Sequence, residues 1–247
     1  MKVNEQQLLV VVVLYNPSHD VVGRYKRYFG KCKLIFIDNS EQATVVKNNE
    51  SVIRFHKNKG YAAAANKALT LMKETDEVRW VLVLNQDLTF TRFQVSLLLQ
   101  QLRNSNCDIG GPFVGYLDNL KWTTFVSRTP DFDLKRIKYV SGSFLAINRN
   151  VLNKQLYFYE PFFMYYEDVD FCVRAYNSGL VLGYIPVHGV SHCEESSSFG
   201  KGSNLHEYYL ARNHLLFVER QAPLYVKLCV FAGIIKSLFY NRFRSKS

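Results

Sequence analysis

The chain has 247 residues, of which 48% are hydrophobic and 15% are aromatic. This composition excludes disordered and collagen-like proteins, and it is sufficient for one large α/β domain or for a core domain with a short appendage. The formal net charge of +10 indicates an anionic partner, for which nucleic acid, a phosphorylated ligand and an acidic membrane surface all qualify.

Alternating strand and helix patterns fill the first half of the chain. Strands are expected over 8–14, 34–37, 51–55 and 80–84, and helices up to residue 29 and over 61–73. The run over 8–14 is continuous and β-branched, which is typical of a strand buried on both faces. This alternation predicts βαβ units with right-handed crossovers and hence a mostly parallel sheet flanked by helices.

Polar residues follow four of these strands: Asn16, Asp38, Asn58 and Asp87. In such sheets, ligands bind outside the carboxyl ends of the strands. We therefore expect the four side chains to converge on one crevice.

The second half of the chain is less regular. We expect a helix over 93–102, short strands and loops over 108–127, a strand over 139–147 interrupted at Gly142, a helix from Glu167 to about Ser178 and a strand over 180–186. A glycine inside a strand often marks a bulge or a close backbone approach.

Two segments of the first half have residues suited to binding a diphosphate. Asp87, directly after an apolar strand, is placed to hold a divalent cation, although aspartate is also a common turn residue. The segment 58–60 precedes a helix whose N-terminus would attract phosphate, although an ordinary alanine-rich helix fits equally well. Neither the P-loop nor the G-x-G-x-x-G dinucleotide pattern is present in the sequence.

The segment 163–174 is the most specific of the chain. Glu167, Asp168 and Asp170 crowd a helix start after an aromatic run. The helix dipole favours an ionised Asp168, which would accept a proton from an attacking hydroxyl. Asp170 and Arg174 are spaced to pair on one helix face. The alternative is a set of simple N-terminal helix acids.

Two histidines, His188 and His192, follow the last predicted strand. Either is a candidate metal ligand, although an isolated histidine is more often structural.

These motifs occur in a fixed order, at 13–17, 36–40, 58–66, 84–87, 141–143, 162–174, 192 and 209–213. Together they resemble the family 2 glycosyltransferases of the GT-A fold, particularly bacterial rhamnosyltransferase-like members. The resemblance implies an α/β, Rossmann-like GT-A domain over 1–222, with a nucleotide-binding half over about 1–88 and an acceptor half over 89–222. A basic amphipathic helix would follow over 223–247.

The resemblance also implies roles for individual residues. Asp168 would be the catalytic base, with Glu167 beside it, and Asp87 and His192 would bind Mn²⁺ or Mg²⁺. The acceptor would contact Gly142, Tyr166, Glu167 and Asp170. The nucleotide-sugar donor would contact Tyr15, Asn16, Asp38, Asn58, Lys59, Gly60, Asn66, Asn85, Gln86, Asp87 and Arg212.

One position departs from the family pattern, because Asn85 replaces the first acid of the D-x-D motif. The pair Gln86-Asp87 resembles the D-Q-D of enzymes that use dTDP-rhamnose, which favours that donor over other dTDP- or UDP-sugars. The resemblance thus implies an inverting, metal-dependent hexosyltransferase acting on a saccharide or lipid-linked saccharide in cell-surface polysaccharide synthesis. A sugar nucleotidyltransferase and a non-enzymatic basic binding protein are the alternatives. The sequence contains no nucleic-acid-binding motif, so it gives no support for a nucleic-acid partner.

The cysteines and the C-terminal segment indicate where in the cell the protein resides. Five cysteines at long spacings, without a C-x-x-C pair, favour free thiols in a reducing, cytoplasmic compartment. The apolar stretch from Leu224 is interrupted by Lys227 and Lys236 and is shorter than the roughly 20 residues that a membrane span needs. We expect this segment either to lie on the anionic inner face of the cell membrane or to pack on the domain or on a second subunit of a homodimer.

Overall fold

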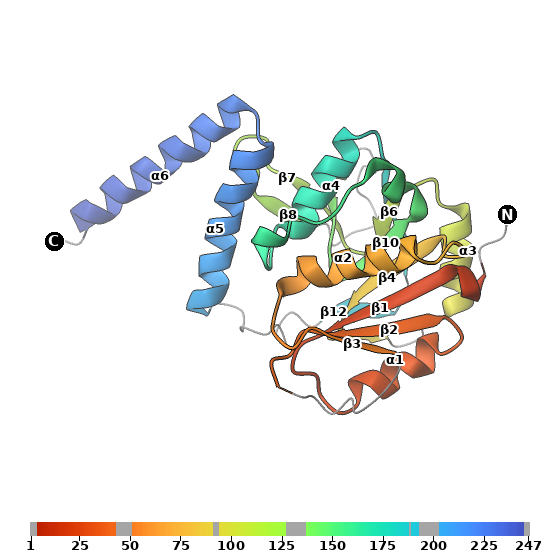
Figure 1. Ribbon diagram of the computed structural model, residues 1–247. Coiled ribbons are helices and arrows are strands. Elements are labelled where there is room, and N and C mark those ends of the chain that lie inside the picture. Colours follow the sequence, from red (N-terminus) through yellow and green to blue (C-terminus); the bar gives the residue numbers. More distant parts are fainter. Residues whose placement is uncertain are drawn as a thin grey trace.

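A seven-stranded sheet forms the centre of the molecule. The computed structural model describes residues 4–42, 51–90, 94–126, 137–187, 189–192 and 203–244. The strands lie in the order β11-β6-β10-β4-β1-β2-β3 (Figure 1). Their bounds are β1 Leu8–Leu14, β2 Lys33–Asp38, β3 Val52–Arg54, β4 Trp80–Asn85, β6 Ile109–Gly111, β10 Phe144–Asn148 and β11 Leu182–Tyr184. Neighbours are parallel except β10, which is antiparallel to both β4 and β6. The predicted α/β fold with a mostly parallel sheet is confirmed, and it is consistent with a GT-A-like arrangement.

Helices cover both faces of this sheet. Those that cover it are α1 Val21–Phe29, α2 Gly60–Lys73, α3 Val95–Asn104 and α4 Glu167–Asn177, and the chain continues with α5 Asn204–Gln221 and α6 Leu224–Arg244. Alternate side chains of β1 belong to different cores: Leu9 and Val11 pack in the core that includes α2 and α4, whereas Val10 and Val12 pack in the core that includes α1 and α3. The valine run is continuous because both faces of β1 are buried.

Two small sheets flank the central one. The first contains β7 Val114–Leu117, β8 Thr124–Val126 and β9 Tyr139–Val140, and the second contains β5 Leu88–Phe90 and β12 Val190–His192. The interruption predicted at Gly142 is the point where the chain changes sheets, since β9 pairs with β7 while β10 pairs with β4. Gly142 therefore lies in a turn between two sheets.

The two C-terminal helices extend from this body. α5 packs against α4, and α6 leaves α5 and projects away from the rest of the molecule (Figure 1). Within the described residues, no helix combines the length and the apolar character that crossing a bilayer requires.

Candidate functional site

The carboxyl ends of β1, β2 and β4 are tied together by side-chain hydrogen bonds. The amide of Gln86 pairs with the backbone of Tyr15 in both directions, at 2.9 and 2.8 Å. The backbone N–H of Asn16 donates to the hydroxyl of Ser40 at 2.8 Å. This edge of the sheet therefore holds Tyr15, Asn16 and Gln86 together, as expected from parallel strands. Because the oxygen and the nitrogen of the Gln86 amide are both used in these hydrogen bonds, this side chain fixes the backbone that leads to Asp87.

Asp38 at the end of β2 is almost wholly enclosed, with 1% of its surface exposed. Its Oδ1 accepts the N–H of Ser40 at 3.0 Å, and its Oδ2 lies 3.3 Å from the guanidinium of Arg54. These partners orient the carboxylate at the strand end. A nucleobase would reach it only after part of this packing shifts.

The glycine at the start of α2 brings the two halves of the chain into contact. Gly60 has φ +82°, and a Cβ there would collide with the carbonyl oxygen of Phe163. The next residue, Tyr61, donates its N–H to that same carbonyl at 2.9 Å. The side chain of Asn58 accepts the N–H of Gly60 at 2.9 Å, so it shapes this turn, and Lys59 donates its N–H to Asn39 at 3.0 Å.

Asn66, on the same helix, is used to fix the fold. Its amide exchanges two hydrogen bonds with the backbone of Phe158, at 3.0 and 2.7 Å, and also donates to Glu160 at 2.9 Å. Asn66 thus clamps the segment before α4 onto α2. Any contact of Asn66 with the donor would have to leave these three hydrogen bonds in place.

Asp87 and His192 meet through the two-stranded sheet. In its antiparallel register His192 lies opposite Leu88, the residue that follows Asp87. The Oδ1 of Asp87 and the Nε2 of His192 are 3.1 Å apart, and this contact lacks hydrogen-bond geometry. One carboxylate oxygen and one imidazole nitrogen facing each other suit a divalent cation. His188, the other candidate, lies outside the described residues.

This pair supplies only part of a coordination shell. No group of three or more His, Cys, Asp or Glu side chains suited to a metal is found within the described ranges. Asn85 is held by its backbone, whose carbonyl accepts from the hydroxyl of Tyr25 and whose N–H donates to Ser143 at 2.9 Å. A cation held by Asp87 and His192 would therefore need further ligands from outside these side chains.

Asp168 lies at the same edge of the sheet. Its carboxylate accepts the N–H of Gly142 at 2.7 Å and its own helix's Val169 N–H at 2.8 Å. Gly142 is followed by Ser143, whose carbonyl binds Asn85 at the end of β4. The turn at 141–143 therefore connects the carboxylate of Asp168 to the strand end that carries Asp87.

Glu167 and Asp168 form a coupled pair of carboxyl groups with different surroundings. Burial and the neighbouring Asp168 raise the pKa of Glu167 well above its usual value, and its Oε2 has no hydrogen-bond partner among the described residues. Burial also raises the pKa of Asp168, but the N–H groups of Gly142 and Val169 oppose that rise. Hydrogen bonds to the charged form favour ionisation. Asp168 is therefore the more readily ionised member of the pair.

The loop before α4 is strained in a way that the sequence did not reveal. Phe163, Tyr165 and Tyr166 all have left-handed φ values, at 65°, 63° and 68°. Such conformations cost about 1–3 kcal/mol each and persist only where the surroundings impose them. The fully buried Asn213 does so, because its Nδ2 donates to three carbonyls of this loop, those of Phe162, Met164 and Tyr165.

Arg212 contacts the same loop. Its guanidinium donates to the carbonyl of Pro161 at 3.0 Å and to the side chain of Asn213 at 2.6 Å. Arg212 and Asn213 both belong to the segment that suggested the resemblance, yet only Arg212 was expected to contact the donor. In the structure the guanidinium of Arg212 stabilises the loop that leads to Asp168.

Asp170, expected to contact the acceptor, is instead fully buried. Its Oδ2 lies 2.8 Å from Arg174, which confirms the predicted pair, and its Oδ1 accepts from Gln221 at 2.8 Å and lies 3.5 Å from Arg220. An acceptor hydroxyl has no open oxygen to bind, because α5 supplies the remaining partners. This carboxylate joins α4 to α5.

Comparisons with known proteins identify a protein of similar sequence. No protein-family model matches the chain. The low-salt glycan biosynthesis hexosyltransferase Agl10 of Haloferax volcanii is 24% identical over 230 residues, which cover 85% of this chain and 74% of that protein. Among solved structures, the crystal structure of A197 from STIV matches with a TM-score of 0.45 and 15% identity, over 76% of this chain and 86% of that one.

Proposed function

We propose that this protein is a glycosyltransferase of glycan synthesis that moves a hexose from a nucleotide-sugar donor to a saccharide acceptor. One observation carries the proposal: the carboxylate of Asp168 and the pair Asp87–His192 lie at one edge of the sheet, linked through the turn at 141–143. The similarity to a protein named as a glycan biosynthesis hexosyltransferase supports the same class of reaction.

Asp168 would be the general base. It is partly accessible, and two backbone N–H groups orient its carboxylate and favour the ionised form. It would take the proton from the acceptor hydroxyl as that oxygen attacks the anomeric carbon, a role typically worth about 10²–10⁴-fold in rate. Direct attack by the acceptor implies inversion at that carbon. Glu167, held neutral, would contribute a hydrogen bond without repelling the departing diphosphate.

Asp87 and His192 would bind a divalent cation together with the diphosphate. The cation would neutralise negative charge on the departing nucleotide. An imidazole ligand favours Mn²⁺ over Mg²⁺, because Mg²⁺ is bound mainly through oxygen. Since Asn85 brings no charge, the protein contributes a single carboxylate to this position, and we expect cation binding to depend strongly on bound donor.

The preferred donor in this proposal is dTDP-rhamnose, on the basis of the pair Gln86-Asp87 in the strand-end motif. The test is a panel of dTDP-rhamnose and the common UDP- and GDP-sugars, each with and without Mn²⁺ or Mg²⁺. We expect one donor to be turned over with release of nucleoside diphosphate, and Asp168→Asn to lose turnover while keeping the donor-induced rise in Tm.

Three results would contradict this proposal. Release of pyrophosphate from a sugar phosphate and a nucleoside triphosphate would identify a nucleotidyltransferase instead. Absence of any donor effect on Tm or turnover would favour a binding protein. Full turnover by Asp168→Asn would remove Asp168 from the role of base.

A further inference from the structure

The outer face of α6 is an apolar surface without a partner in the described chain. Leu224, Leu228, Phe231 and Ile235 follow one another at helical spacing, and their exposed fractions are 71%, 60%, 63% and 39%. Residues spaced by three, four or seven share one face of a helix, so the four side chains form a single stripe. We call these four residues the α6 stripe.

The opposite side of α6 holds the helix on the domain. Val226 is fully buried and Val230 is partly buried, and both pack in a small cluster with Val218 and Ala222. The α6 stripe therefore faces outward while the helix is anchored by its other side, and Figure 1 shows α6 standing clear of the body. Contiguous exposed apolar surface of this kind marks an interaction site.

The charged residues of the sequence from Ala222 onward are all of one sign. From Ala222 to the end of the sequence there is no Asp or Glu, whereas Lys227, Lys236, Arg242, Arg244 and Lys246 are all cationic. A symmetric dimer built on the stripe would bring two copies of this cationic segment together, which is unfavourable. An anionic surface fits both the apolar stripe and the cationic character of this segment.

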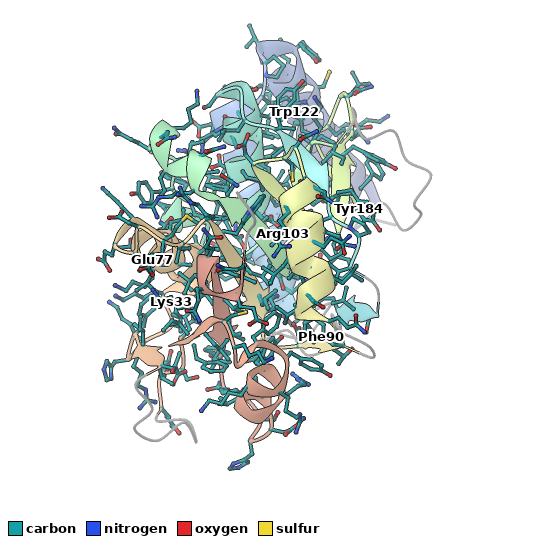
Figure 2. All side chains as sticks on the ribbon, turned by 90° about the vertical axis from the view of Figure 1, so that its right-hand side faces the viewer. Lys33, Glu77, Phe90, Arg103, Trp122 and Tyr184 are labelled. Atoms are coloured by element: carbon teal, nitrogen blue, oxygen red, sulfur yellow. The ribbon has the colours of Figure 1, made fainter. Side chains whose placement is uncertain are left out.

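We propose that α6 docks the protein on an anionic lipid bilayer, with the α6 stripe inserted at the level of the headgroups. The cluster that anchors α6 also includes Trp122, whose ring lies 5.4 Å from that of Phe217. Phe217 in turn lies 5.6 Å from Tyr166, the residue before Glu167. Figure 2 shows Trp122 in the upper part of the molecule, far from Phe90 of β5 in the lower part.

This chain of contacts places the membrane-facing helix beside the acceptor half of the molecule. If the proposed sugar transfer is correct, the arrangement suits an acceptor carried on a lipid. The docking itself rests only on α6, and a result on sugar transfer leaves it standing.

The test is co-sedimentation of the full chain with vesicles of phosphatidylcholine alone or mixed with phosphatidylglycerol. We expect binding to the mixed vesicles only, weakened by salt. Because Lys227 and Lys236 each contribute attraction, replacing either with alanine should reduce partitioning about fivefold. The double variant Leu228→Glu, Phe231→Glu should abolish binding.

The matched control is Leu97→Glu, which changes another exposed leucine, on α3, and should bind as the unaltered chain does. Apart from the half-buried Lys227, all substituted side chains are exposed, and none belongs to the cluster that anchors α6, so the Tm of each variant should be unchanged. Failure of the unaltered chain to bind mixed vesicles, or normal binding by the double variant, would overturn the proposal. A dimer in solution that the double variant converts to monomer, without vesicle binding, would overturn it in favour of a second copy.

Discussion

Replacing Asn213 with alanine should weaken both the fold and the catalytic loop. The amide Nδ2 of Asn213 donates to the carbonyls of Phe162, Met164 and Tyr165 at 2.7, 2.5 and 3.0 Å. An NH₂ group has two hydrogens, so the three contacts correspond to two full hydrogen bonds, one of them shared. At about 1 kcal/mol net for each, plus the cost of leaving buried carbonyls unsatisfied, the loss should be about 2–3 kcal/mol.

The loss of unfolding free energy in Asn213→Ala should be measurable by thermal unfolding. For a domain of this length, it should lower Tm by about 5–10 °C. The same loop positions Tyr166 in a left-handed conformation immediately before Glu167 and Asp168. Its relaxation would displace the base, and a shift of about 1 Å can cost up to about 10²-fold in rate. We therefore expect kcat to fall more than the loss of stability alone would explain.

The assay combines thermal unfolding with donor turnover at a temperature where the variant remains folded. Asn150→Ala is a suitable control, because the Asn150 amide makes one exposed hydrogen bond, to Asp108. It should leave Tm and kcat nearly unchanged. If Asn213→Ala matched this control in both measurements, the left-handed loop would have to be held by other contacts, and the reasoning would fail.

Two further predictions concern the charged groups of the site. Because the folded-state pKa of Glu167 is raised, the folded protein binds more protons than the unfolded one, so stability should decline as pH rises above the usual glutamate pKa. Glu167→Gln should remove this decline in chemical unfolding followed against pH, and an identical pH profile for both proteins would refute a neutral Glu167. Replacing His192, which lies 3.1 Å from Asp87, with alanine should raise the Mn²⁺ concentration needed for half-maximal turnover by about 10-fold or more, since half of the protein's contribution to the site is lost. Unaltered Mn²⁺ dependence in a titration of donor turnover would exclude His192 as a ligand.

The sequence by itself determined the central sheet and the edge where the candidate site lies. The run 8–14 is apolar at every position, and only a strand covered on both faces accommodates such a pattern. Polar residues at the ends of parallel strands necessarily share one edge, which is why Asn16, Asp38 and Asp87 could be grouped in advance. The helix start at Glu167 and the interruption at Gly142 were likewise local signals.

Only the tertiary structure decided how individual polar side chains are used. Asp170 and Asp168 are alike in sequence, yet Arg220 and Gln221, some fifty residues away, enclose the first, while Gly142 orients the second. No local pattern identified Asn213 as the residue that holds the loop before α4, since its three partners are backbone carbonyls of another segment. Whether an apolar face is core or surface also depends on which neighbours cover it. For this reason the periodicity of α6 could not show which of its faces is buried against the domain and which remains exposed.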